Sequence, residues 1–173
     1  MSKKVIIRPV QDDDIQAIVD IYDYYVNNSC VTFEWTPPSL QEMNERVHHI
    51  QSQGYPYLVL EEAGQVIGYA YVSPYRSRKG WSWCVEDSIY LKHGHDGHGY
   101  GSMLLEALIV ECKKINIRMM VAVISANENI ASIRLHQKMG FRMVGTMIDV
   151  GYKFNEWQNV VFMQKDMGIP TKL

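Results

Sequence analysis

The stretch HDGHGYGSMLLEALI, from His95 to Ile109, places three glycines within seven residues and then becomes apolar at helical spacing. Glycine inside a regular element costs about 0.5–1 kcal/mol relative to alanine, so a cluster of glycines indicates that bare backbone is needed. The start of a helix offers unpaired N–H groups and the positive end of a dipole, which together bind anions. The stretch therefore predicts an anion-binding loop at the N-terminus of a helix.

The spacing of the glycines excludes two familiar phosphate-binding loops. A Walker loop ends in Gly-Lys-Ser/Thr, whereas serine follows Gly101 directly. The Gly-x-Gly-x-x-Gly spacing of a dinucleotide fold is absent from this stretch, which also lies in the middle of the chain. A pyrophosphate site is the better interpretation. A structural turn is the alternative, although it needs one or two glycines rather than the four at Gly94, Gly97, Gly99 and Gly101.

The composition is that of an ordinary globular domain. The chain has 173 residues, 47% hydrophobic and 21% charged, and one domain of residues 1–173 is expected. A net charge of −2 without a basic run argues against a nucleic-acid partner. No stretch approaches the ~20 apolar residues of a membrane helix, and the N-terminus does not resemble a signal peptide. Three widely spaced cysteines suit a reducing compartment, so a cytoplasmic location is expected.

Hydrophobic periodicity predicts an alternation of strands and helices. Helices are expected over residues 12–28, within residues 36–54 with Ser39 as N-cap, after the glycine loop, and over residues 129–139. Strands are expected over residues 5–8, 57–62, 66–73, 83–91, 119–124, 141–150 and 159–166. This order mixes hairpins with crossovers, which indicates an α/β (α+β) domain with a mixed sheet flanked by helices.

Four segments, in this order, resemble the acetyl-CoA core of the GNAT superfamily of N-acetyltransferases: VEDSIYL (85–91), DGHGYGS (96–102), MMVAVI (119–124) and NENIASIRLHQKMGF (127–141). Two more, FEW (33–35) and GYKFNEWQNVVFMQKD (151–166), extend the resemblance over Val5 to Met167. They make the chain similar to the phosphinothricin and methionine sulfoximine N-acetyltransferases. The resemblance implies a GNAT fold, in which a mixed sheet is splayed between two parallel central strands and flanked by about four helices.

The resemblance also implies acetyl-CoA as co-substrate. The edge of a splayed strand would pair with the pantetheine arm, the glycine loop would bind the pyrophosphate, and the next helix start would contact the arm. Carried onto this sequence, these residues are Ile89, Tyr90 and Leu91, then Gly97, His98, Gly99, Tyr100, Gly101 and Ser102, and finally Asn129 and Ser132. Plain N-capping is the alternative for Asn129. Asp96 stands where the superfamily usually has arginine or glutamine, and an acid there would repel a pyrophosphate unless it turns to solvent.

Acetyl transfer to an amine needs a group that accepts a proton from the ammonium form. Glu86 matches the family's catalytic glutamate and is predicted to be this general base, with a solvated strand acid as the alternative. Its neighbour Asp87 should point to the opposite face of a regular strand. No acyl-enzyme nucleophile is needed, so Cys84 is interpreted as a packed thiol. The H-x-H-x-x-H of residues 93–98 lacks a completing ligand, and no metal is predicted.

The acceptor site is expected around the segment YRSRKGWSW (75–83). An arginine can hold a carboxylate through two parallel hydrogen bonds and so orient the amine of an amino acid toward Glu86. Arg76 is the first candidate and Arg78 the second, and solvated loop charges are the alternative for both. Phe33 is either a pocket wall or a core residue. The substrate-binding candidates are therefore Phe33, Tyr75, Arg76, Arg78, Glu86 and Asp87.

These features predict an enzyme that transfers an acetyl group from acetyl-CoA directly to the α-amine of a small amino-acid-like compound, such as phosphinothricin, methionine sulfoximine or methionine sulfone. The resemblance implies a homodimer, and neither nucleic acid nor a membrane is an expected partner. Two alternatives stay open. One is a GNAT enzyme for another amine, such as a polyamine or a protein N-terminus, and the other is a non-catalytic acyl-CoA-binding regulatory module.

Overall fold

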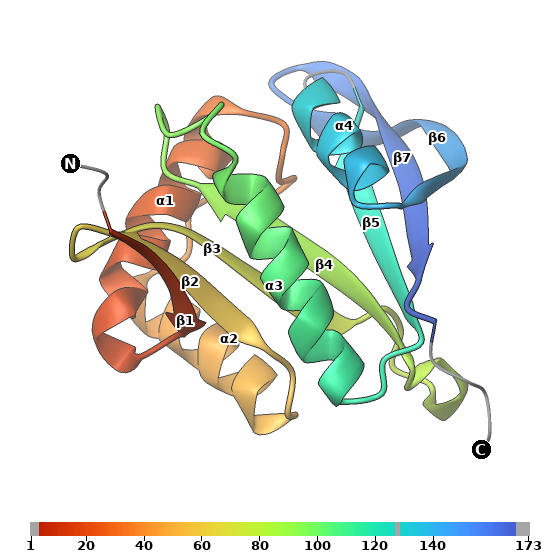
Figure 1. Cartoon of the computed structure of the whole chain (residues 1–173). Coiled ribbons are helices and arrows are strands. Elements are labelled where there is room, and N and C mark those ends of the chain that lie inside the picture. Colours follow the sequence, from red (N-terminus) through yellow and green to blue (C-terminus); the bar gives the residue numbers. More distant parts are fainter. Residues whose placement is uncertain (1–3, 127–128, 169–173) are drawn as a thin grey trace.

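The computed structural model describes residues 4–126 and 129–168, and its strands form one seven-stranded sheet in the order β1-β2-β3-β4-β5-β7-β6 (Figure 1). Every neighbouring pair is antiparallel except β4 and β5, which are parallel. The strands are β1 Val5–Pro9, β2 Tyr57–Glu62, β3 Gln65–Pro74, β4 Cys84–Leu91, β5 Met119–Ser125, β6 Arg142–Lys153 and β7 Glu156–Asp166. This mixed sheet confirms the predicted fold class.

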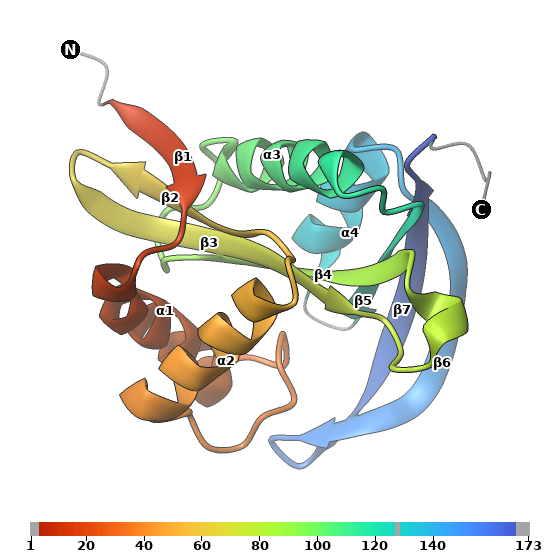
Figure 2. The same cartoon turned by 90° about the horizontal axis from the view of Figure 1, so that it is seen from below.

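Helices cover both faces of the sheet, with α1 and α2 on one face and α3 and α4 on the other (Figure 2). Their bounds are α1 Ile15–Asn28, α2 Leu40–Ser52, α3 Tyr100–Lys114 and α4 Ile130–Lys138, with short 3-10 turns at η1 Asp12–Asp14 and η2 Lys79–Trp81. As predicted, Ser39 caps α2, because its Oγ accepts a hydrogen bond from the Glu42 N–H at 3.1 Å. Within the described residues, no helix is both long and apolar enough to cross a bilayer.

Each helical layer packs its own apolar core against the sheet. α3 buries Leu104, Leu105 and Leu108 completely, and α1 and α2 bury Ile18 and Val47 on the other face. Burial of one such side chain contributes about 1.5–3 kcal/mol. These two cores therefore fix the helix ends that surround the centre of the sheet.

The last two strands are longer than the periodicity predicted. The expected strands end at residue 150 and begin again at residue 159, whereas the observed hairpin continues to Lys153 and Glu156. A register shift over residues 147–151, with Asp149 at a φ of 53°, interrupts the alternation on which the prediction depends. The two-residue turn at 154–155 has positive φ at both positions but contains no glycine, so the usual hairpin signature is missing.

β4 and β5 pair over only three residues and then separate. Cys84–Glu86 pair with Met119–Val121, after which β4 remains paired with β3 as far as Leu91 and β5 with β7 as far as Ser125. The facing edges of β4 and β5 beyond Glu86 therefore carry backbone groups outside the sheet ladder. The resulting V is visible in Figure 1 and confirms the splayed sheet that the resemblance implies.

Candidate active site

A cavity of about 290 Å³ lies in the V between β4 and β5. Its walls are residues 86–90 of β4, residues 122–125 of β5, the inner face of α4, and residues 31–33 of the connection between α1 and α2. A second cavity of about 240 Å³ lies at the start of α3 and shares Val31, Ile89, Asn129 and Ser132 with the first. The two cavities are therefore adjacent, and together they make up the groove, which extends from the glycine loop to Glu86.

The glycine loop presents backbone to this groove. Gly94, Gly97 and Gly99 all have φ of 80–81°, a conformation that residues with side chains disfavour. Gly99 is the N-cap of α3, and no side chain caps this helix end. A Cβ at Gly97 or Gly99 would meet no atom within 4 Å, so there is open space beside the loop. The turn requires glycine and its uncapped helix end suits an anion, so the loop geometry is compatible with both interpretations.

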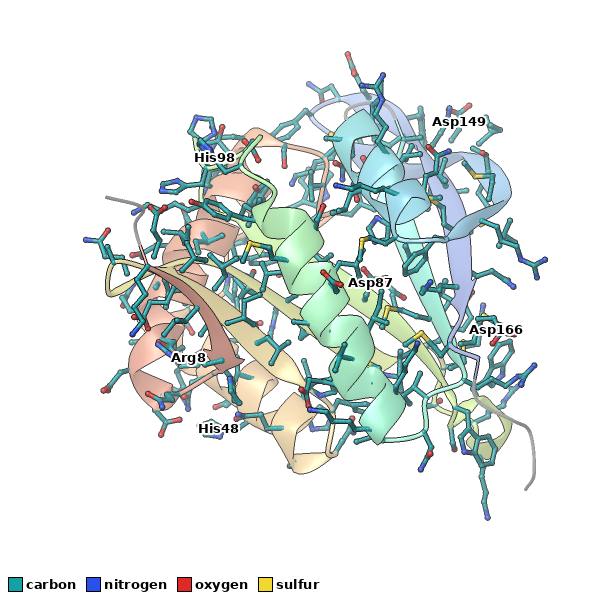
Figure 3. All side chains as sticks on the ribbon, viewed as in Figure 1. Arg8, His48, Asp87, His98, Asp149 and Asp166 are labelled. Atoms are coloured by element: carbon teal, nitrogen blue, oxygen red, sulfur yellow. The ribbon has the colours of Figure 1, made fainter. Side chains whose placement is uncertain are left out.

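The side chains around the loop leave this helix end open. The Tyr100 hydroxyl donates a hydrogen bond to Glu62 on β2. Burial, followed by the charge of Asp96, raises the pKa of Tyr25 to about 12, and both residues line the second cavity. His98 lies exposed at the edge of the molecule (Figure 3). In the part of the chain that the structure describes, no group of histidine, cysteine and carboxylate side chains could hold a metal ion.

The unpaired edge of β4 offers fewer backbone groups than expected. The Leu91 carbonyl accepts a hydrogen bond from the Tyr25 hydroxyl at 2.7 Å and is therefore already engaged. Tyr90 packs its ring against Tyr22 and Tyr69, each at a centroid distance of 5.2 Å, and its backbone pairs with Tyr69 of β3. At the start of α4, the side chain of Asn129 makes no capping hydrogen bond although it lines both cavities. Asn129 is therefore the N-cap residue of α4 by position, as the alternative expected, but its side chain does not cap the helix.

Glu86 lies at the closed end of the groove. Its backbone pairs with Val121 in the last pair before the strands separate, and its half-buried side chain lines the cavity. Burial, followed by the charge of Asp87, raises the pKa of the Glu86 carboxyl above its ordinary value. No hydrogen bond from the described residues opposes this shift. A carboxylate with a raised pKa and no committed partner is suited to accept a proton.

Asp87 points away from Glu86, as predicted, and forms a buried pair with His136 of α4. Nε2 of His136 lies 2.9 Å from Asp87 Oδ2, and Nδ1 lies 2.7 Å from the Ser132 carbonyl oxygen. Because both ring nitrogens face acceptors, each of the two contacts needs a proton. Burial lowers the pKa of His136, but the hydrogen bond and charge of Asp87 outweigh it and raise the pKa overall. Asp87 is buried and lies near the middle of the molecule in the view of Figure 3.

His136 is a site residue to which the sequence analysis gave no role. It lies four residues after Ser132 on the same face of α4, and both residues line the cavity. That i,i+4 spacing from a predicted cofactor residue is the signal that could have found it. The second carboxylate oxygen of Asp87 is buried without a hydrogen-bond partner among the described residues. Buried polar atoms are normally bonded, so this oxygen is an exception among the described residues.

Replacing Asp87 with asparagine is expected to lower thermal stability most at acid pH. Because Asp87 raises the pKa of His136, its contribution to stability is fully present below the ordinary histidine value of about 6.5. This contribution is lost as pH rises through the raised pKa. The difference in Tm between the wild type and Asp87→Asn should therefore shrink as pH rises above about 6.5. Exposed Asp23→Asn is the control, and a pH-independent difference for Asp87→Asn would show that His136 carries no charge.

The two arginines expected to bind a carboxylate lie outside the lining of both cavities. Arg76 and Arg78 are exposed in the connection between β3 and β4. The Arg76 guanidinium lies 5.3 Å from the centroid of the Tyr75 ring, which fixes its position by a cation–π contact. This connection begins just after Ser73, the strand partner of Glu86, so it lies beside the closed end of the groove. Phe33, in contrast, lines the cavity and is 37% exposed, as a pocket wall would be.

The sequence model of the acetyltransferase (GNAT) domain matches residues 7–162, which is most of the chain. This chain belongs to the GNAT acetyltransferase family. Among relatives of this GNAT chain, phosphinothricin N-acetyltransferase of Alcaligenes faecalis is 38% identical over 161 residues, covering 93% of this chain and 82% of the relative. L-methionine sulfoximine/L-methionine sulfone acetyltransferase of Pseudomonas aeruginosa is 37% identical over 160 residues, covering 92% of each.

Solved GNAT structures share the whole fold. An acetyltransferase from Salmonella typhimurium with its cofactor acetyl-CoA superimposes with a TM-score of 0.93 at 35% identity, covering 97% of this chain and 96% of the other. A phosphinothricin acetyltransferase from Sinorhizobium meliloti in complex with acetyl-CoA gives 0.91 at 41% identity, covering 95% and 89%. These similarities confirm the predicted GNAT fold and the predicted enzyme class, an N-acetyltransferase.

Proposed function

We propose that this GNAT chain works as a single domain that transfers the acetyl group of acetyl-CoA directly to the α-amine of a small amino-acid-like compound. The expected acceptors are of the phosphinothricin, methionine sulfoximine or methionine sulfone type, after which the two relatives are named. The observation that carries the proposal is the groove, which connects an uncapped helix start to the uncommitted carboxylate of Glu86. The cysteines form no disulfide, which supports a reducing, cytoplasmic compartment.

The residues of the groove fit a long anionic thioester. The first turn of α3, from Gly99 to Ser102, offers N–H groups and a helix dipole to a pyrophosphate. The unpaired edge of β4 at Ile89 offers backbone groups to an amide-bearing arm, opposite Asn129 and Ser132. The two solved relatives with acetyl-CoA support this assignment. When bound, the thioester supplies an activated acetyl group at the closed end.

Glu86 acts as the general base. Its carboxylate accepts a proton from the acceptor ammonium, directly or through one water, and its raised pKa brings it closer to that of the ammonium. The neutral amine attacks the thioester carbonyl carbon and forms the C–N bond, the C–S bond breaks, the amide nitrogen releases its second proton to solvent, and the departing thiolate takes a proton. The Asp87–His136 pair holds a proton on the opposite wall of the same cavity and is suited to supply it.

Polyamines are a second acceptor class that one observation favours. The charged and titratable groups of the cavity wall include Glu86, Asp87 and His136, and the described lining contains neither lysine nor arginine. A cavity wall with these charges favours a polycationic acceptor over an acceptor that carries a free carboxylate. Thiol release should be measured with methionine sulfone, phosphinothricin, spermidine and a short peptide. We expect the highest kcat/KM for an amino-acid analogue. A higher kcat/KM for spermidine or for the peptide would show that the acceptor is a polyamine or a protein N-terminus instead. The absence of turnover with any amine would favour a regulatory acyl-CoA-binding module.

Replacing Arg76 with alanine is expected to raise the KM for an amino-acid acceptor far more than the KM for its methyl ester. A charge-assisted hydrogen bond contributes about 1.5–3 kcal/mol, which corresponds to a rise of about 10- to 150-fold for the free acid. Steady-state kinetics with both acceptors measure the difference. Lys79→Ala, in the same connection, is the matched control. Equal losses for acid and ester would remove Arg76 from the carboxylate site.

A homodimer is expected to form through the β6–β7 hairpin. Large apolar side chains are exposed along it: Met143, Val144, Met147, Ile148, Val150, Tyr152, Phe154 and Trp157. A concentration of exposed apolar surface typically marks a protein interface. Sedimentation should give the mass of two chains, and Ile148→Asp, at a position 63% exposed, should give one folded chain. Val110→Asp on α3, at a position 48% exposed, should stay dimeric. A wild-type monomer would refute this interface.

A further inference from the structure

Residues 29–35, the acceptor loop, lie between α1 and α2 and form one wall of the cavity beside Glu86. Val31, Thr32 and Phe33 line that cavity. From the helix side, the Tyr22 hydroxyl lies 2.7 Å from Thr32 Oγ1. From the other side, the loop meets the far end of β6, more than a hundred residues later in the chain. Figure 2 shows the β6–β7 hairpin curving beneath the sheet toward the connection between α1 and α2.

Lys153 at the end of β6 binds the backbone of the acceptor loop. Its side chain is almost fully buried, with 2% exposure, and its ammonium donates hydrogen bonds of 2.8 Å to the carbonyl oxygens of Ser29 and Thr32. Lysine is rarely buried without partners that satisfy its charge. The Glu34 carboxylate lies in the same loop; burial raises its pKa, but the hydrogen bonds from Arg46 and Tyr22 and, to a smaller extent, the charge of Lys153 lower it overall. Lys153 therefore fixes the path of the loop backbone.

Gly151, two residues earlier on the same strand, forms the seat of the Phe33 ring. A Cβ at Gly151 would lie 2.4–2.8 Å from three atoms of that ring, far inside van der Waals contact. Gly151 does not have a positive φ, so its backbone conformation alone does not require glycine. Gly145 on the same strand also lies at a register shift, yet a Cβ there would meet nothing within 4 Å. The requirement for glycine at 151 comes from Phe33.

We propose that Gly151 and Lys153 are positioning residues for the acceptor, because they hold Phe33 and the acceptor loop back from the cavity and so set the size of side chain that it admits. This inference rests on the proposed function only in taking the cavity beside Glu86 as the acceptor site. A side chain at 151 would displace the Phe33 ring from its seat. Since the neighbouring loop residues line the cavity, the displacement narrows the space for the acceptor and leaves the cofactor end of the groove unchanged.

The kinetic test compares Gly151→Ala with Gly145→Ala. Overpacking costs about 1–3 kcal/mol, so we expect kcat/KM for the acceptor to fall about 5- to 150-fold in Gly151→Ala. The loss should be larger for methionine sulfone than for alanine, while acetyl-CoA affinity stays at the wild-type value. Gly145→Ala should match the wild type. Equal behaviour of the two alanine variants, or weaker acetyl-CoA binding in Gly151→Ala alone, would overturn the proposal.

A double-mutant cycle tests whether Gly151 acts through Phe33. Phe33→Ala removes the ring, so adding Gly151→Ala in that background should cause no further loss. If Gly151→Ala alone fails to fold, the double variant should recover the fold, because the clash is gone. An undiminished effect of Gly151→Ala without Phe33 would contradict the role of the ring.

Lys153→Met supplies a measurement that does not depend on turnover. Methionine keeps much of the apolar stem but donates no hydrogen bond to the loop carbonyls. We expect backbone amides of residues 29–35 to exchange with solvent at least about tenfold faster, whereas exposed Lys114→Met leaves them unchanged. Unchanged exchange in Lys153→Met would overturn the role of Lys153. Because exchange is measured without substrate, it tests the hydrogen bonds from Lys153 to the acceptor loop even if the enzyme prefers another amine. Thiol release by the wild type tests the acceptor class separately.

Discussion

Replacing Glu86 with glutamine is expected to leave acetyl-CoA affinity unchanged and to lower kcat by about 10²- to 10⁴-fold, the usual contribution of a positioned proton acceptor. Glutamine keeps the size of the side chain but cannot take up a proton at neutral pH. The loss should shrink at high pH, where more acceptor amine is already neutral. The measurement is kcat against pH, with calorimetric titration of acetyl-CoA. Wild-type kcat in Glu86→Gln across this range would remove Glu86 as the base.

The stability of the same variant separates catalysis from structure. Because the folded-state pKa of Glu86 is raised, its ionisation disfavours the folded state; the stabilising contribution is present at low pH and lost as pH rises through the raised pKa. At neutral pH, Glu86→Gln should therefore be at least as stable as the wild type while nearly inactive. Exposed Glu106→Gln on α3 should change neither property. A less stable Glu86→Gln with normal turnover would indicate a structural carboxylate.

Replacing Gly99 with valine is expected to weaken acetyl-CoA binding by about 10- to 100-fold. The φ of 80° at this N-cap costs a branched residue at least about 1–2 kcal/mol, so the loop must shift and the N–H groups of the first turn lose their alignment. The side chain would also enter the open space beside the loop. Calorimetric titration with acetyl-CoA measures the change.

Gly64 provides the matched control for this substitution. It has a φ of 83° in the turn between β2 and β3, and a Cβ there would also meet nothing within 4 Å. Gly64→Val therefore carries the same backbone strain away from the groove and should lose stability but keep acetyl-CoA affinity. Equal affinities in Gly99→Val and Gly64→Val would show that the glycine loop is a structural turn only.

The parts of the site that could be predicted from the sequence are those that depend on neighbouring residues in the chain. The glycine cluster before an apolar helix predicts the uncapped start of α3, and Ser39 with Glu42 predicts a helix cap, because both signals lie within one turn of chain. Strand alternation places Glu86 and Asp87 on opposite faces, as the structure confirms. The roles assigned to the individual site residues stay predictions.

The parts that sequence did not predict depend on contacts between distant segments. The Asp87–His136 pair joins residues 49 positions apart, and Lys153 reaches carbonyls 124 and 121 positions away. Hydrophobic periodicity does not encode such contacts, and the local sequence around one residue of a buried ion pair does not identify its partner. Gly151 likewise resembles any glycine in a strand until the Phe33 ring is placed against it. Asn129 is an ordinary capping residue type at the N-cap position of α4, but its side chain makes no capping hydrogen bond.

The short pairing of β4 with β5 has a mechanical consequence. Within the sheet, three residue pairs join the two halves, so Glu86 sits at the pivot of any opening, which the contacts of Asp87 with His136 and of Lys153 with the acceptor loop limit. Leu91, five residues farther along β4, lies about 16 Å away, and each degree of opening moves it by roughly 0.3 Å. An opening of the far end that admits a long molecule would therefore displace Glu86, the proposed base, very little. The V between β4 and β5 therefore allows its entrance to widen while the proposed site of proton transfer stays in place.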